Sequence, residues 1–270
     1  MYRSRFTGTF AAIAAVAAAV LTGAGNAAAA PAAPTIVLVH GAFADPSSWD
    51  GVASRLRADG YTVVVPPNPL RGPAFDAASV ERAIAGIDGP IVLVGHSYGG
   101  AVITNVDDPD VRALVYVAGF APTEGEPAQL LLDPIRFPGS RLLPPVLQLG
   151  VVDDPSGIGG RNVDGFVAPE YFQQVFAQDV SPATAATMAA RQRSIAVAAN
   201  LEPSGPAAWR HVPSWYVVSA DDRVIPPAAQ RFMAGRIGAV TSELPASHAS
   251  LVSEPEQVAA VVENAAAAAR

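Results

Sequence analysis

The stretch IVLVGHSYGGAV, residues 91–102, passes from an apolar, β-branched run through three glycines, a histidine and a serine into a second apolar segment. A strand that turns abruptly into a helix strains the residue at the apex, and the residues two positions away must then be nearly free of side chain. Gly95 and Gly99 flank Ser97 at that spacing. An ordinary glycine-rich loop is the alternative, but a phosphate loop requires Gly-Lys-Ser/Thr and the chain has no lysine. The pattern therefore predicts that Ser97 is an exposed nucleophile.

Short apolar runs of the same kind recur along the chain and read as strands buried on both faces. Helix-like stretches lie between them, and this alternation predicts a parallel sheet with right-handed crossovers. The closing helix is expected to begin at Ser253, which has capping-box spacing to Glu256. The predicted strands are 35–39, 61–65, 90–94, 113–118, 214–219 and a weaker 239–244, and the first helices are 47–58, 76–87 and 97–105.

One segment interrupts the alternation, at about 120–210. It is rich in proline and glycine at first and helix-like in 169–178 and 182–194. A detour of this length between two strands is too long for a simple loop. We therefore expect a largely helical cap inserted over the carboxyl ends of the strands.

The first 30 residues have the order of a secretory signal peptide. Arg3 and Arg5 precede an apolar run at 10–21, which is followed by small residues. An uncleaved anchor is the alternative, but the apolar run is shorter than the roughly 20 residues that a spanning helix requires. We expect cleavage near Ala28–Ala30, export from the cell, and a mature chain, 31–270, that forms one domain without stable membrane insertion.

Composition excludes several function classes. Half of the 270 residues are hydrophobic, which is enough for one good core, and the formal net charge of −7 argues against a nucleic-acid partner. The chain has no cysteine, so disulfides, thiol chemistry and thiolate metal sites are excluded.

A serine hydroxyl is a poor nucleophile until a histidine takes its proton. His40 and His96 adjoin glycine turns at strand ends, where structural hydrogen bonding is the better interpretation. His211 precedes a strand, on the wrong side for the chain order serine, acid, histidine. His248, in a loop after the last predicted strand, is therefore the expected base.

The histidine needs a carboxylate to fix its tautomer. Asp221 and Asp222 directly follow the predicted strand 214–219, and only one of two adjacent side chains in extended backbone can face the histidine. The residues alone do not separate the two. The oxyanion formed in the reaction needs backbone N–H donors, and we expect these from Tyr98 and from Ala42 or Phe43 in the first loop.

These motifs resemble the α/β-hydrolases, and within them the small six-stranded branch that includes plant methylesterases and hydroxynitrile lyases. VLVHGAF resembles the oxyanion loop of that family, GHSYGG its nucleophile turn, DRVIPPAAQ its acid loop and SHAS its histidine loop. The resemblance implies an α/β-hydrolase fold with a mainly parallel six-stranded sheet flanked by helices. The family's spacing of the acid before the Ile-Pro pair implies Asp222. Of the two candidates in the first loop we choose Ala42 as the second oxyanion donor, and we expect no cofactor or metal.

Departures from the family narrow the activity. The lyases carry a lysine after the catalytic histidine, where this chain has Ala249, and a serine rather than aspartate or cysteine at position 97 favours esters. Phe43, Phe120 and Phe172 are the expected substrate contacts of a small to medium, mostly apolar carboxylic ester. Two alternatives remain: a cofactor-free perhydrolase or haloperoxidase, although these have methionine where Tyr98 stands, and a non-catalytic ligand-binding relative.

Overall fold

The computed structural model describes Met1 and residues 33–270. The predicted signal peptide, including its cleavage region near residues 28–30, lies outside the described residues apart from Met1. The remaining chain is one compact unit, 32–270. None of the described helices is long and apolar enough to cross a membrane.

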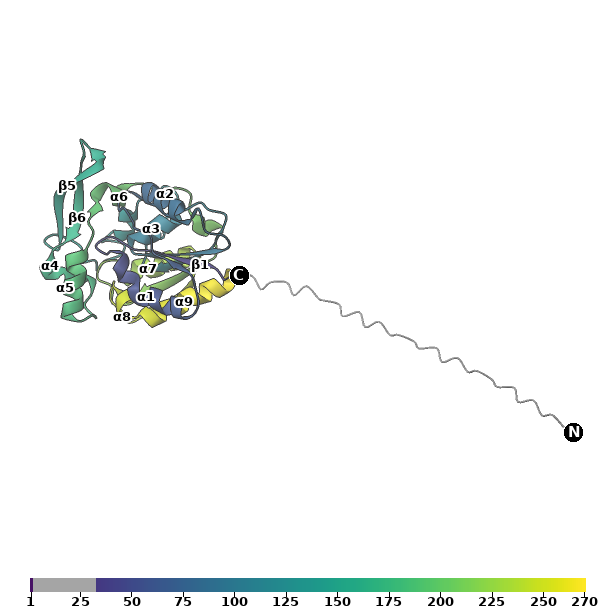
Figure 1. The fold of residues 1–270 in the computed structure, drawn as a ribbon. Helices are drawn as coiled ribbons and strands as arrows, with labels where there is room; N and C mark the ends of the chain where they lie inside the picture. The colour runs from purple at the N-terminus through teal and green to yellow at the C-terminus, as the bar shows by residue number, and fades with distance from the viewer. Residues whose placement is uncertain (2–32) are drawn as a thin grey trace. The chain divides into compact units, whose positions relative to one another are not determined.

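A six-stranded parallel sheet forms the centre of this unit, as the sequence predicts (Figure 1). The apolar runs of β1, β3 and β8 are fully buried strands because helices cover both faces of the sheet. In sheet order the strands are β2 (Val63–Val64), β1 (Thr35–Val39), β3 (Ile91–His96), β4 (Val111–Val117), β8 (Ser214–Ser219) and β9 (Val240–Leu244).

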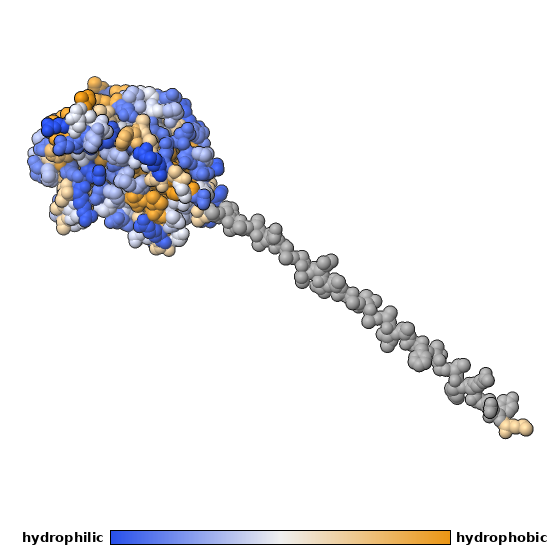
Figure 2. Space-filling model, turned by 45° about the horizontal axis from the view of Figure 1, so that its top comes forward, coloured by the Kyte–Doolittle hydropathy of each residue, from blue (hydrophilic) through white to orange (hydrophobic). Residues whose placement is uncertain are grey.

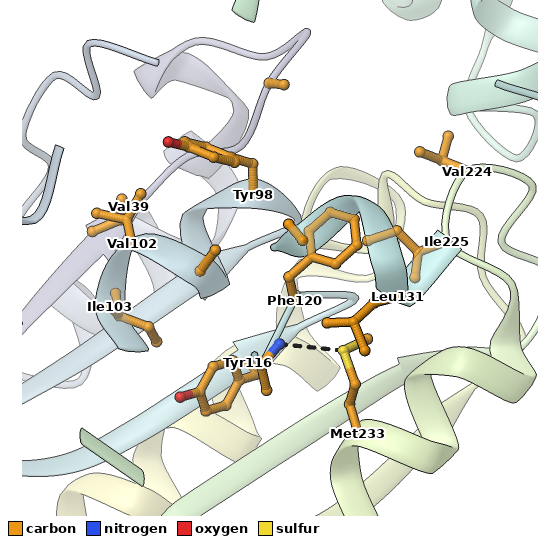
Figure 3. Packing of buried hydrophobic residues seen from close by; sticks show 14 of the residues in the cluster. Val39, Tyr98, Val102, Ile103, Tyr116, Phe120, Leu131, Val224, Ile225 and Met233 are labelled. Atoms are coloured by element: carbon orange, nitrogen blue, oxygen red, sulfur yellow. Dashed lines mark hydrogen bonds between the residues drawn. The ribbon is translucent and has the colours of Figure 1, made fainter. Parts of the chain in front are cut away.

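Two apolar clusters hold the helices on the sheet. One joins a face of the sheet to α1 (Asp50–Ala58) and α9 (Pro255–Ala268). The other joins the opposite face to α2 (Pro73–Ile84), α3 (Tyr98–Thr104) and α7 (Pro227–Arg236). Figure 3 shows part of this second cluster, where Met233 of α7 accepts a hydrogen bond through Sδ from the backbone N–H of Ala121 at 3.2 Å.

The segment between β4 and β8 lies to one side of the sheet, where β5, β6, α4 and α5 are seen in Figure 1. Besides helices it contains a three-stranded antiparallel sheet, which the expectation of a largely helical cap does not include. The glycines and Pro155 of β5 obscure the alternation expected of a strand. Several of the apolar side chains of this strand are also exposed. Its elements are η2 (Ala128–Leu132), β5 (Leu147–Ile158), β6 (Arg161–Val167), α4 (Pro169–Phe176), α5 (Pro182–Arg191), β7 (Ile195–Ala196), α6 (Val197–Leu201) and η3 (Ala208–Arg210).

Proline at the first helical position moves three predicted boundaries, because its fixed φ suits that position and it needs no N–H partner there. A 3₁₀ turn, η1 (Pro46–Trp49), precedes α1, and α2 begins at Pro73 rather than at residue 76. The predicted capping box is wrong: Ser253 ends the short helix α8 (Ser250–Ser253), and α9 begins at Pro255 without a side-chain cap. The Ser253 hydroxyl donates instead to Asp179 at 2.9 Å.

The surface is mostly hydrophilic with separate apolar patches on the face drawn in Figure 2. The most exposed apolar side chains of the cap sheet are those of Leu149, Val151 and Ile158.

Candidate active site

Ser97 lies at the turn between β3 and α3 with φ of 53° and ψ of −123°, which is the strained backbone that the glycine spacing predicts. The flanking glycines are required by close backbone approach. A Cβ at Gly95 would lie 2.5 Å from the carbonyl oxygen of Gly99, and a Cβ at Gly99 would collide with the carbonyl oxygen of Val39. The turn is therefore fixed by its surroundings and not only by its own sequence.

The loop after β1 meets this turn because β1 and β3 are parallel neighbours. A Cβ at Gly41 would lie 2.6 Å from Ser97 Cβ and 3.2 Å from Ser97 Oγ. This close approach brings the backbone of the first loop beside the serine hydroxyl, and only glycine permits it.

His248 and Asp222 are paired in the structure. The distance between His248 Nδ1 and Asp222 Oδ2 is 2.6 Å, and both side chains are fully buried. The adjacent carboxyl, Asp221, belongs to an exposed residue. Of the two candidates that the residues leave open, Asp222 is therefore the one that contacts the histidine.

Three other groups hold the Asp222 carboxylate in place. Oδ1 accepts the backbone N–H groups of Val224 at 2.7 Å and Ile225 at 3.0 Å, and Oδ2 accepts Gln230 Nε2 at 2.7 Å. Gln230 is itself fully buried, and its Oε1 accepts the N–H of Ser219 at 2.9 Å. The sequence predictions include no helix over residues 227–236, and Gln230 was missed with it. A polar residue on the buried face of a helix signals a buried group that requires partners.

Two rings pack against the imidazole of His248. The ring of His96, the residue before Ser97, lies 4.8 Å away, and the ring of Phe176 from α4 meets it edge-on at 4.8 Å. His248 Nε2 is buried and has no hydrogen-bond partner among the described residues. With Nδ1–H donated to the Asp222 carboxylate, Nε2 is the nitrogen left to accept a proton.

The other histidines have structural positions. His96 Nε2 donates to the backbone carbonyl of His248 at 2.9 Å, and burial, followed by the nearby His248, lowers the pKa of His96 well below its ordinary value. His40 Nδ1 donates to the carbonyl of Gly41 at 2.9 Å, and burial lowers the pKa of His40 to about 4. His211 is exposed.

The first loop offers one unpaired oxyanion donor among its two candidates. The N–H of Phe43 donates to the carbonyl of Arg193 in the cap at 2.9 Å. Within residues 33–270, the N–H groups of Ala42 and Tyr98 have no hydrogen-bond partner. The geometry thus leaves free the N–H groups of Ala42 and Tyr98, which are the two expected donors.

Two cavities, of about 450 Å³ and about 270 Å³, share Phe43 of the first loop in their lining, and Ser97, Asp222 and His248 line neither of them. Phe120 and Phe172 line neither of them, although both were expected substrate contacts. Phe120 is bonded through its N–H to the carbonyl of Ser97 at 3.0 Å, and Phe172 stacks on Phe176 at 4.9 Å. Phe176, which is not among these expected contacts, is the cap ring that packs against His248.

In the part of the chain that the structure describes, no group of three His, Asp or Glu residues is arranged to hold a metal ion.

Comparisons with known proteins agree with this architecture. A family model described as the alpha/beta hydrolase family matches residues 36–261. A pyrethroid hydrolase of Sphingobium wenxiniae is 30% identical over 251 residues, which cover 84% of this chain and 85% of that protein. A carbendazim-hydrolyzing esterase of Nocardioides sp. is 35% identical over 111 residues, a match that spans only 46% of that protein. The crystal structure of polyneuridine aldehyde esterase has the same fold, with a TM-score of 0.71 at 17% identity over 86% of this chain and 98% of that chain.

Proposed function

The chain belongs to the alpha/beta hydrolase family, and we propose that within it this protein is a serine carboxylesterase that works through an acyl-enzyme intermediate. The observation that carries the proposal is the buried His248–Asp222 pair at 2.6 Å with Nε2 of His248 left free, next to the strained turn of Ser97. The named relatives that hydrolyse a pyrethroid and carbendazim support the choice of ester-type substrates.

In the proposed reaction, Ser97 Oγ attacks the ester carbonyl carbon while His248 Nε2 takes the hydroxyl proton. The Asp222 carboxylate stabilises the imidazolium that forms. The N–H groups of Ala42 and Tyr98 bind the tetrahedral oxyanion, an interaction that contributes a large part of the rate enhancement in such enzymes. The alcohol leaves with the proton from His248, and water then releases the acid from Ser97 by the reverse sequence. No cofactor or metal takes part.

The larger cavity supports a mostly apolar substrate. Its lining contains no charged side chain and includes Leu132, Leu142, Leu147 and Ile195, in addition to Phe43. A volume of about 450 Å³ is in the range that holds a small to medium organic ligand. An uncharged ester with an apolar acyl or alcohol group fits this chemistry.

Export of the enzyme is a further part of the proposal, and it rests on the order of charged, apolar and small residues in the first 30 positions. Intact-mass measurement of protein from the culture medium tests it. A mature chain that begins near Ala29 supports cleavage, and a cell-bound form that retains Met1 contradicts it.

The activity is tested with nitrophenyl esters of increasing acyl length and with a fluorophosphonate probe, which labels activated serines. We expect turnover by the wild type, labelling at Ser97, and a loss of several orders of magnitude in Ser97→Ala with an unchanged fold. Turnover that appears only with added peroxide would favour a perhydrolase. A wild type that neither hydrolyses esters nor reacts with the probe would identify a non-catalytic binding protein.

A further inference from the structure

Tyr98 links the proposed oxyanion site to a buried carboxylate, through its backbone at one end and its phenol at the other. Its backbone N–H is one of the proposed oxyanion donors, and its ring is buried and extends away from Phe120 (Figure 3). The phenol donates to Oδ2 of Asp76 at 2.8 Å. Burial, followed by the charge of Asp76, raises the pKa of Tyr98 well above its ordinary value, so the phenol stays protonated and remains a donor.

Asp76 is fully buried in the first turn of α2. Its carboxylate accepts the N–H of Arg71 on both oxygens at 3.1 Å and the N–H of Gly72 at 3.4 Å, in addition to the phenol. It therefore ties the turn that precedes α2 to the first residue of α3. None of these hydrogen bonds takes part in the proposed proton transfers, so the Asp76 carboxylate has no role in the chemical steps themselves.

The turn before α2 is also tied to the cap. The Arg71 guanidinium makes two hydrogen bonds to Asp164 of β6, at 2.7 and 2.8 Å, and lies 3.3 Å from Asp154 of β5. Asp164 is fully buried and also accepts the hydroxyl of Ser194 at 2.6 Å. A second bond, from the N–H of Ala196 to the carbonyl of Leu70 at 3.0 Å, joins the same turn to β7.

We propose that Asp76 is a positioning residue that fixes the oxyanion-binding N–H of Tyr98, and that the Arg71–Asp164 ion pair makes this placement depend on a seated cap. The inference rests on the proposed esterase function. Removal of the phenol hydroxyl frees the Tyr98 ring from Asp76 and lets the first turn of α3 relax. Loss of Asp164 loosens the turn that orients Asp76. A change in the cap therefore also displaces the N–H of Tyr98.

Tyr98→Phe tests the first half, with Tyr116→Phe as the matched control. Tyr116 is also a buried tyrosine, and its hydroxyl bonds to Thr104 at the other end of α3 at 3.0 Å. Complete loss of an oxyanion donor costs about 10²–10³ in kcat, so a displaced donor is expected to lower kcat by about tenfold with little change in KM. Affinity for a trifluoromethyl ketone, which mimics the tetrahedral intermediate, should fall by the same factor as kcat/KM. Tyr116→Phe should change neither quantity.

Asp76→Asn provides a second variant in case Tyr98→Phe does not fold. The amide can still contact the phenol, so its loss in kcat should be smaller than that of Tyr98→Phe. If Tyr98→Phe, or Asp76→Asn in its place, matches Tyr116→Phe in kcat and in ketone affinity, Asp76 has only a structural role and the inference is wrong.

Asp164→Asn tests the dependence on the cap, with Glu126→Gln as its control, because Glu126 forms a half-buried pair with Arg236 at 2.9 Å that does not contact Arg71. We expect a lower kcat and weaker ketone binding only in Asp164→Asn. Wild-type values in that variant would refute the cap dependence. A wild-type enzyme without ester turnover or probe labelling would instead refute the proposed function, which Ser97→Ala monitors in the same assay.

Discussion

Replacement of Asp222 by asparagine is expected to abolish most activity while the fold is retained. The carboxylate accepts His248 Nδ1–H at 2.6 Å, which leaves Nε2 unprotonated and able to act as a base. Asparagine can turn its amide N–H toward Nδ1, and the imidazole then carries its proton on Nε2, the wrong nitrogen for the reaction. A change of tautomer of this kind lowers kcat by about 10⁴.

The cost in stability follows from the four hydrogen bonds that the carboxylate accepts. The asparagine carbonyl can keep the N–H groups of Val224 and Ile225. Its NH₂ group then faces Gln230 Nε2, which retains only its bond to the carbonyl of Ile225 at 2.8 Å. One charge-assisted bond is lost and one buried donor contact becomes unfavourable, so the free energy of unfolding should fall by about 2 kcal/mol.

Asp221→Asn is the matched control, because its side chain is exposed and no side-chain hydrogen bond of Asp221 occurs in residues 33–270. Steady-state hydrolysis of a nitrophenyl ester gives kcat, and urea unfolding followed by circular dichroism gives the stability of each variant. Equal losses in both variants, or a loss confined to Asp221→Asn, would refute the assignment of Asp222 as the acid.

Two further perturbations test the backbone contacts and the buried histidines. Gly99→Ala should lower the free energy of unfolding by about 3 kcal/mol because its methyl group collides with the carbonyl of Val39. Gly235→Ala in α7 is the control: a Cβ there meets nothing within 4 Å, so this change should raise the free energy of unfolding by about 0.5–1 kcal/mol. Urea unfolding measures both variants, and a loss of stability in both would contradict the steric explanation. The pKa of His40 is about 4 in the folded protein and 6.5 ordinarily, so as the pH falls the unfolded chain takes up this proton before the folded protein does. Neutral His40 therefore contributes its full stabilisation above pH 6.5, and the contribution is lost as the pH falls toward 4. The shift corresponds to about 3 kcal/mol, and His40→Gln should flatten the pH dependence of the urea midpoint over that range; a slope equal to that of the wild type would show that His40 is not responsible.

The central sheet could be predicted from the sequence because each buried parallel strand is a continuous apolar run. The run 35–39 and the strand β1 coincide, and the glycines around Ser97 predict a strained turn that the structure confirms at φ of 53°. The family resemblance is likewise confirmed by the match over residues 36–261. These signals are local, so a single sequence contains them.

The parts that sequence reasoning missed depend on contacts between distant segments. Gln230 is buried because it meets Asp222 and the N–H of Ser219, and its helix alone does not reveal that partner. The β5–β6 hairpin alternates weakly because its outer face is exposed and apolar, so neither strand period nor helix period stands out. Phe176 looks like any core aromatic until α4 is placed over His248.

Substitutions near the catalytic residues and substitutions in the cap should affect this enzyme differently. The turn of Ser97 is fixed by close backbone contacts that only glycine permits, and Asp222 and His248 form a fully buried pair. Changes at these positions therefore cost both stability and the proposed chemistry. The larger cavity is lined mostly by cap residues whose exchange leaves those supports intact. Substitutions in this cavity lining should therefore alter the preferred ester at small cost. Cap residues that contact the core differ, and the ion pair between Asp164 and Arg71 is the example argued above. A substitution that breaks this ion pair should disturb the turn that orients Asp76. Substrate specificity and kcat should then change together.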